Sequence, residues 1–255
     1  MSTPASLAVD PRWRVVVVST HFDDAVLSTG GFLITTDLPA AVLTAHGGAP
    51  DPSAPVSSWD LDCGFVSAQE AYATRREEDR RACAAVGADQ VLLPNPDNPY
   101  RDGGPPTGLA EFLDRLDPGV TVVLPLGTNQ PDHTAVCDAA IDLLERQPDR
   151  PLWVYADLPY AAALVPRWRD APVAEVEAAL EQHDPRFRQL RARHRLTLRH
   201  GEPMDATTWS RKRQAVFSYA SQLSLVGGMG EVRHLGPMLR YPGALQRELI
   251  WAAQP

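Results

Sequence analysis

The stretch that decides the fold runs from Val15 to Gly31 and reads VVVVSTHFDDAVLSTGG. It starts with four consecutive valines, an apolar run typical of a strand buried on both faces in a parallel sheet. A polar turn with His21, Asp23 and Asp24 follows, and apolar residues then recur at helical spacing, which places Asp24 near the start of a helix. Open α/β sheets bind their ligands at such turns. The stretch therefore predicts an α/β fold with a candidate site at the end of its first strand.

The polar turn contains side chains that suit a metal site. His21 and Asp24 can converge on one cation, and a catalytic site needs one more imidazole or carboxylate from elsewhere while it keeps a position for water. Asp23 is then left over as the base that acts on this water. The same residues are also compatible with a structural turn, in which both aspartates cap the helix and His21 has no role in chemistry. A further site residue has to decide between these interpretations.

The alternation of buried strand and helix continues along the chain. We expect strands at residues 41–45, 90–94, 120–126 and 152–156, a final edge strand at 248–251, and helices at 67–86, 109–116, from 133 onward, at 173–181 and at 209–219. This pattern predicts a Rossmann-like, three-layer fold with a mostly parallel central sheet and helices on both faces, in one domain of residues 1–255. Residues 49–64 and 161–203 break the alternation and are expected to be loop insertions.

A second polar turn follows the strand expected at 120–126. It reads GTNQPDH over residues 127–133 and brings Asp132 and His133 to the start of a helix. Because both turns should lie at the carboxyl edge of one parallel sheet, His133 can approach His21 and Asp24 although they are distant in sequence. His133 is thus the candidate for the third metal ligand.

Composition limits the classes of function. The 255 residues are 44% hydrophobic and 22% charged, and a net charge of −8 argues against nucleic-acid binding, which favours basic proteins. The N-terminal residues show no leader pattern, and no apolar run is long enough for a membrane span. The three cysteines form no CxxC pair and predict neither disulfides nor a thiolate zinc site. We expect a cytoplasmic enzyme acting on a small molecule, with no nucleic-acid or membrane partner; homo-oligomer formation is left open.

The two turns together resemble the motifs of the LmbE-like, or PIG-L, family of zinc-dependent N-deacetylases, which remove acetyl groups from N-acetylglucosamine-type sugars. The family's AHPDDE motif corresponds to THFDDA at residues 20–25, and its HPDH motif to QPDH at residues 130–133. Weaker matches at residues 43–48, 75–87, 212–222 and 248–251 extend the resemblance over nearly the whole chain. Several blocks in the right order are more specific than any single motif.

The resemblance implies a role for each residue of the two motifs. It assigns His21, Asp24 and His133 as ligands of Zn²⁺, Asp23 as the catalytic base, and Asp132 as a residue that lies beside His133 and tunes it. The same donor set also suits Fe²⁺ or Co²⁺.

Other polar residues are candidates for the substrate-binding side, because a polyhydroxylated substrate needs such groups: Arg75, Glu78, Asp97 and Tyr160. Arg75 and Glu78 are equally compatible with an ion pair at the edge of the core. Six arginines between residues 186 and 199 could bind an anionic group, but an acid-paired surface is the favoured interpretation in this acidic protein.

Two residues depart from the family motifs. Ala25 replaces an acidic residue, and Gln130 replaces the first histidine of HPDH, which resembles a general acid or oxyanion stabiliser in relatives. Glutamine can donate a hydrogen bond but not a proton at neutral pH. Either Asp23 acts as both base and acid, which we favour because the motif already places it, or another residue such as His46 or His234 replaces the lost group, or the chain is a weak or altered hydrolase.

The sequence thus predicts a metal-dependent hydrolase that removes an N-acetyl or other N-acyl group from an amino-sugar-containing small molecule or natural-product glycoside. The alternatives are an amidase that acts on a larger acyl or thiol conjugate and a catalytically weak sugar-binding homologue.

Overall fold

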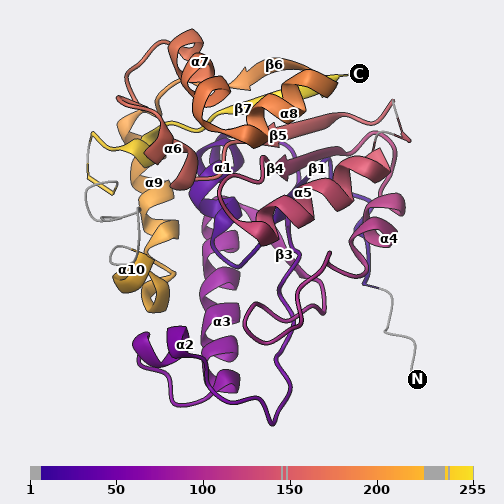
Figure 1. Ribbon diagram of the computed structural model, residues 1–255, viewed down its shortest axis with the longest axis vertical. Coiled ribbons are helices and arrows are strands. Elements are labelled where there is room, and N and C mark those ends of the chain that lie inside the picture. Colours follow the sequence, from indigo (N-terminus) through magenta and orange to yellow (C-terminus); the bar gives the residue numbers. More distant parts are fainter. Residues whose placement is uncertain (1–6, 145, 148, 227–238, 241, 255) are drawn as a thin grey trace.

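A single mixed sheet forms the centre of the computed structural model, which describes residues 7–144, 146–147, 149–226, 239–240 and 242–254 (Figure 1). Its strand order is β3-β2-β1-β4-β5-β7-β6. The strands are β1 (Val15–Ser19), β2 (Ala40–Thr44), β3 (Ala88–Leu92), β4 (Thr121–Pro125), β5 (Leu152–Tyr155), β6 (Arg195–His200) and β7 (Ile250–Gln254). Strands β1 to β5 pair in parallel, and β7 is antiparallel to both of its neighbours.

Strand β1 lies in the interior of the sheet, and all of its residues are buried. Val17 pairs with Val42 of β2 on one side and with Val123 of β4 on the other. The strand order runs outward from β1 in one direction and from β4 in the other, so the two adjacent carboxyl ends form a topological switch point. Ligands of open α/β sheets bind in the crevice at this point.

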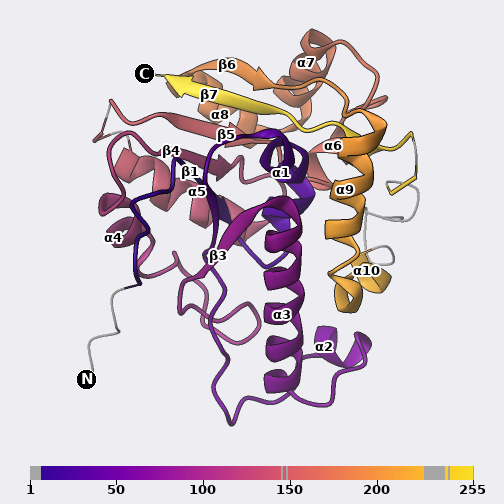
Figure 2. The same ribbon diagram turned by 180° about the vertical axis from the view of Figure 1, so that it is seen from behind.

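Helices cover both faces of the sheet, as Figures 1 and 2 show from opposite sides. One face carries α1 (Asp24–Thr35), α3 (Ala68–Val86) and α9 (Ala206–Val216), and the other carries α4 (Leu109–Asp114), α5 (Pro131–Leu144), α7 (Val173–His183) and α8 (Pro185–Arg193). The shorter helices are α2 (Ser58–Asp62), α6 (Tyr160–Leu164) and α10 (Ala220–Val226), with a 3₁₀ turn at Ala244–Gln246. The predicted fold class, a mostly parallel sheet between helical layers, is confirmed.

The C-terminal strand differs from the prediction. Strand β7 lies inside the sheet, between β5 and β6, and is not an edge strand. The outer strand is β6, which reads RLTLRH. This strand was not predicted from the sequence, because its polar and charged residues indicated a surface segment. Alternating apolar and polar residues are typical of a strand with one buried face.

The two predicted insertions contain regular structure. Residues 49–64 include α2, and residues 161–203 include most of α6 together with α7, α8 and β6. Asp184 caps α8 by accepting a hydrogen bond from Arg186 N at 2.8 Å. Three of the six arginines between residues 186 and 199 lie near a carboxylate: Arg186 near Asp138, Arg191 near Glu181 and Arg193 near Asp142. Arg188 instead donates to the backbone carbonyls of Glu181 and Gln182.

None of the helices in the described part of the chain is both long and apolar enough to cross a membrane.

Candidate active site

The turn after β1 is built to present His21 and Asp24. Ser19 Oγ donates to the His21 carbonyl at 2.6 Å and accepts from Ala25 N at 2.9 Å, so this serine closes the turn. Asp24 Oδ2 accepts from His21 N at 2.8 Å. Asp23 occupies the N-cap position, but its side chain makes no capping hydrogen bond. Helix capping therefore does not account for the carboxylate of Asp23.

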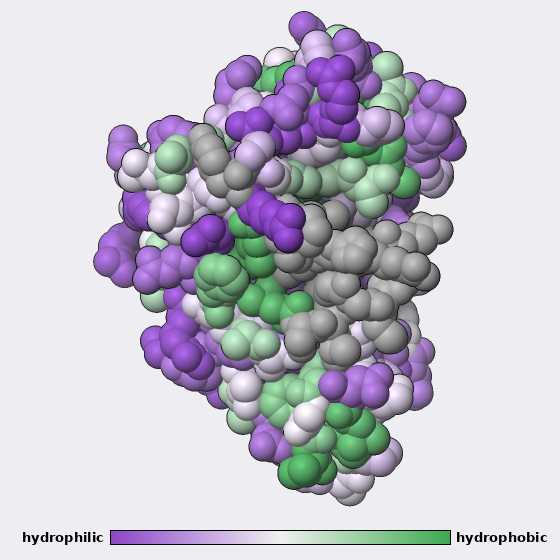
Figure 3. Space-filling model, turned by 90° about the vertical axis from the view of Figure 1, so that its left-hand side faces the viewer, coloured by the Kyte–Doolittle hydropathy of each residue, from purple (hydrophilic) through white to green (hydrophobic). Residues whose placement is uncertain are grey.

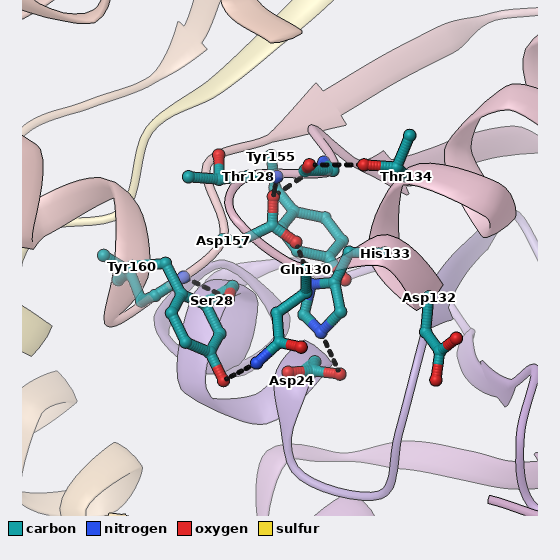
Figure 4. Close-up of polar contacts among 12 residues, drawn as sticks. Asp24, Ser28, Thr128, Gln130, Asp132, His133, Thr134, Tyr155, Asp157 and Tyr160 are labelled. Carbon is teal, nitrogen blue, oxygen red and sulfur yellow. Dashed lines mark hydrogen bonds and ion pairs between the residues drawn. The ribbon is translucent and has the colours of Figure 1, made fainter. Parts of the chain in front are cut away.

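The turn after β4 presents His133 on the first turn of α5. Its Nδ1 lies 2.7 Å from Oδ1 of Asp157, which follows β5. The other Asp157 oxygen accepts from Gly127 N at 2.8 Å and from Thr128 N at 3.1 Å. The His133 ring is thereby fixed with Nε2 directed at Asp24, as Figure 4 shows.

His21, Asp24 and His133 form a group that can bind a metal ion. One ligand atom from each residue lies within 4.8 Å of the other two. Asp24 Oδ2 is 3.3 Å from His21 Nδ1 and 3.2 Å from His133 Nε2. This Nε2 is buried and has no hydrogen-bond partner among the described residues. A buried ring nitrogen that makes no hydrogen bond, beside a carboxylate and a second imidazole, fits a ligand of a borderline divalent cation.

The charge balance of this group favours a cation. Burial lowers the pKa of His133, but the interactions with Asp24 and Asp157 together outweigh burial and raise the pKa to about 9. Burial raises the pKa of Asp24, but both histidines hold it well below its usual range. The surrounding carboxylates thus stabilise positive charge at this position.

Asp23 is not part of the ligand group. Its pKa is raised to about 7 by burial and by the charge of Asp24. A carboxylate with a pKa near neutrality suits a general base.

Asp132 contacts His21 and not His133, which corrects the arrangement that the resemblance implied. Its Oδ2 lies 3.4 Å from His21 Nε2, and its Oδ1 pairs with Arg101. Adjacent helical residues project in different directions, and Figure 4 shows Asp132 pointing away from His133. The carboxylate that contacts Nδ1 of His133 is that of Asp157.

Asp97 also faces His21, with Oδ1 at 3.3 Å from His21 Nε2. His21, Asp97 and Asp132 satisfy the same distance criterion as the first group. His21 therefore lies between two acidic groups, with Nδ1 toward Asp24 and Nε2 toward the other two carboxylates.

Gln130 and Tyr160 form a pair above the ligands. Gln130 Nε2 donates to the Tyr160 hydroxyl at 3.1 Å, and the tyrosine ring packs edge-on against His133 with centroids 5.7 Å apart. Burial raises the pKa of Tyr160, and the charges of Asp24 and Asp23 raise it further, so the hydroxyl keeps its proton. The pair places neutral hydrogen-bond donors beside the candidate ligands.

The sequence model of the PIG-L family, described as GlcNAc-PI de-N-acetylase, matches residues 16–144, just over half of the chain. The chain belongs to the PIG-L family. Membership confirms the family that the two motifs indicated and the predicted class of reaction, N-deacetylation by amide hydrolysis. No curated protein is a significant match.

Solved structures of deacetylases resemble this PIG-L member over nearly its full length. The A40926 pseudoaglycone deacetylase Dbv21 is 25% identical, with 95% of this chain and 97% of that chain covered and a TM-score of 0.64. A deacetylase of the teicoplanin biosynthesis pathway is 22% identical, with 94% and 97% covered and a TM-score of 0.66. The N,N'-diacetylchitobiose deacetylase from Pyrococcus horikoshii is 14% identical, with 94% and 83% covered and a TM-score of 0.51. The last two likenesses show the fold alone.

Arg75 and Glu78 do not pair with each other, so the interpretation as an ion pair is wrong. Each finds a partner on another element, since both project from α3 toward different neighbours. Arg75 Nη2 lies 2.6 Å from Asp60 Oδ1 of α2, and Glu78 accepts from Ser221 N and Oγ at 2.9 and 2.6 Å. Both side chains support helices that flank the site.

Helix α2, which Arg75 anchors, ends in an apolar surface. Leu61 and Val66 are exposed, and Figure 3 shows an apolar area at this end of the molecule. Asp60 is the buried residue through which Arg75 holds α2 in place, and the apolar side chains that follow it are exposed.

His46 lies beneath the site. It is 1% exposed, its ring stacks on His21 with centroids 5.7 Å apart, and neither ring nitrogen has a hydrogen-bond partner among the described residues. Burial lowers its pKa to about 4, and the charge of His21 adds to this, so His46 is neutral at pH 7. His234, the other alternative proton donor, lies outside the described residues.

Two residues of the site were missed in the sequence. Asp157 follows a buried strand at the same sheet edge as both motifs, and this placement was a usable signal. Arg101 lies in the connection between β3 and α4, where no pattern indicated its contact with Asp132.

Proposed function

We propose that this PIG-L member uses a divalent cation, with Zn²⁺ the first candidate, to remove the N-acetyl group from an amino sugar of a natural-product glycoside. His21, Asp24 and His133 are the proposed ligands. The observation that carries the proposal is the buried Nε2 of His133, which faces Asp24 and His21 without a hydrogen-bond partner among the described residues. Fe²⁺ and Co²⁺ suit the same donors.

A bound divalent cation would supply a Lewis acid, which lowers the pKa of a water molecule toward about 7 and polarises an acyl oxygen. Asp23 is the proposed base, because its carboxylate is free of capping contacts and is half-buried next to the ligand Asp24. It accepts a proton from the water as the water oxygen bonds to the acyl carbon. The carbon–nitrogen bond then breaks, and Asp23 returns the proton to the leaving amine.

Gln130 and Tyr160 are proposed to hold the acyl oxygen. One hydrogen of the Gln130 amide is donated to Tyr160, and the other remains for the substrate. Asp132 is proposed to orient the His21 ring through its contact with Nε2. Asp97 and Tyr160 are proposed to contact the sugar. Arg75 and Glu78 contribute by supporting the flanking helices.

The proposed substrate class follows from the similar structures. Dbv21 is named as a deacetylase of the A40926 pseudoaglycone and covers almost the whole chain at 25% identity. A glycoside of comparable kind, with an N-acetylated amino sugar, is therefore the first substrate to test. The family description, a de-N-acetylase of GlcNAc-PI, also names an N-acetylated sugar.

The test combines metal analysis with an acetate-release assay on a panel of N-acetylglucosamine conjugates. We expect one equivalent of divalent metal per chain and acetate release from at least one glycoside. His133→Ala should lose both metal and activity, whereas Asp23→Asn should keep the metal and lose about 10²- to 10⁴-fold in kcat. Asp62→Asn, an exposed change on α2, is the matched control and should behave as the parent.

Three results would contradict the proposal. Full activity of Asp23→Asn would exclude it as the base. Release of only longer acyl groups or thiol conjugates would identify an amidase of different specificity. A folded chain that binds no divalent metal would favour a catalytically weak sugar-binding homologue.

A further inference from the structure

The connection between β3 and α4 carries two neighbouring side chains, Tyr100 and Arg101, that contact different helices. The Tyr100 hydroxyl donates to Asp60 of α2, and Ser57 N donates to this hydroxyl at 3.0 Å. Arg101 pairs with Asp132 at the start of α5. One short segment thus contacts both helix α2 and Asp132, the carboxylate that contacts His21.

The side chain of Arg101 is only 10% exposed, although charged side chains on a connection between two elements usually face solvent. Nη2 pairs with Asp132 Oδ1, and Nη1 donates to the Gly104 carbonyl at 3.0 Å. Nε is buried and has no hydrogen-bond partner in the described part of the chain. Burial of a charge is costly and needs a close partner, so the pair with Asp132 is what holds the guanidinium there.

The pair also fixes the orientation of Asp132. With Oδ1 held by Arg101, the other oxygen lies 3.4 Å from His21 Nε2. His21 Nδ1 then faces Asp24 at 3.3 Å. A ligating histidine commonly donates its other ring N–H to a carboxylate, which selects the tautomer and orients the ring.

We infer that Arg101 is a positioning residue of the metal site. It holds Asp132 so that Oδ2 accepts the Nε2 proton of His21, which leaves the Nδ1 lone pair of His21 for the cation. The hydrogen bonds of the Arg101 side chain go to Asp132 and to the Gly104 carbonyl, so Arg101 acts on His21 through Asp132. The inference rests on the proposed function only in taking His21, Asp24 and His133 as the metal ligands.

The test measures zinc affinity of the metal-free full chain by competition with a chromophoric chelator, without an activity assay. Arg101→Met should raise the Kd for Zn²⁺ by about 10- to 100-fold. Arg101→Lys keeps the charge but not the planar guanidinium, and should lie between the parent and Arg101→Met. Tyr100→Phe is the matched control on the same segment, because its contact goes to α2, and should bind zinc as the parent does.

A double-mutant cycle shows whether Arg101 acts through Asp132. In an Asp132→Ala background, Arg101→Met should cause no further loss of zinc affinity. Histidine ¹⁵N spectra of the zinc-loaded parent should show His21 protonated at Nε2, and Arg101→Met should weaken this signature. Circular dichroism of each variant separates these effects from unfolding.

Parent-like zinc affinity of folded Arg101→Met, or fully additive losses in the cycle, would overturn the inference while leaving the metal site in place. If Arg101→Met fails to fold, Arg101→Lys takes its place, and either a parent-like zinc affinity or a loss that is fully additive with the loss caused by Asp132→Ala has the same meaning. A parent chain that binds no zinc would instead contradict the proposed function itself.

Discussion

Each imidazole of the proposed metal site has a carboxylate on the side away from the ligand group. His133 directs Nδ1 at Asp157, and His21 directs Nε2 at Asp132 and Asp97. The remaining nitrogens both approach Asp24 Oδ2. Since such partners fix the tautomer of a ligand, the geometry is set by residues that lie outside the ligand group itself.

Gln130 allows a prediction at the scale of one side chain. We expect Gln130→Leu to lower kcat by about 10²-fold with little change in KM, because one donor to the acyl oxygen and the donor to Tyr160 are lost together. Zinc affinity should stay at the parent value, since Gln130 contacts none of the proposed ligands through its hydrogen bond. Steady-state kinetics on an N-acetylated glycoside and a zinc titration check the two expectations.

Unchanged turnover of Gln130→Leu would show that the residue that replaces the family histidine has no part in the reaction. Tyr160→Phe is the companion variant, because it removes the hydroxyl and keeps the ring that packs on His133.

At the scale of elements, α1 is held by the C-terminal part of the chain. Glu248 is 0% exposed and accepts hydrogen bonds from Gly31 N and Phe32 N of α1 at 2.7 and 2.8 Å. Lys212 of α9 neutralises it, with Nζ 2.6 Å from Oε1. The N-terminus of α1 carries Asp24, so this ion pair supports the element that presents the ligand.

We expect Lys212→Met to lower the free energy of unfolding by about 3–5 kcal/mol, because it leaves Glu248 as a buried charge without its cation. Urea unfolding followed by circular dichroism measures the loss. Arg80→Met is the matched control: it breaks the exposed pair with Glu77 and should leave unfolding nearly unchanged. Equal effects of the two variants would contradict the role given to the buried pair.

The same elements show what the sequence could predict. The run of valines in β1 indicated a buried strand of the sheet, and the two polar turns indicated the three residues that come together, since buried strands and motif residues have clear patterns. Strand β6 and helix α8 were missed because their arginines indicated a charged surface. The partners of Arg75 and Asp132 depend on contacts between elements, which spacing along one helix does not reveal.

At the scale of the whole molecule, a buried carboxylate links three parts of the fold. Asp79 of α3 is 0% exposed; it accepts from Gln90 of β3 at 2.6 Å and from the Tyr219 hydroxyl, just after α9, at 2.8 Å. Burial raises its pKa to about 7. Because unfolding exposes this group and returns its pKa to the usual range, its ionisation is coupled to global unfolding.

The sign of this coupling gives the last prediction. A raised pKa in the folded state means that the contribution of Asp79 to stability is complete below about pH 4 and is lost as the pH rises through about 7. Asp79→Asn should remove this dependence, since its amide stays neutral throughout this pH range. Measured by urea unfolding between pH 5 and 8, the parent should lose stability relative to Asp79→Asn by up to about 1.4 kcal/mol per pH unit below pH 7. A difference between the two proteins that does not change with pH would mean that Asp79 ionises alike in the folded and unfolded chains, and the three linked elements would then owe their pairing to the hydrogen bonds alone.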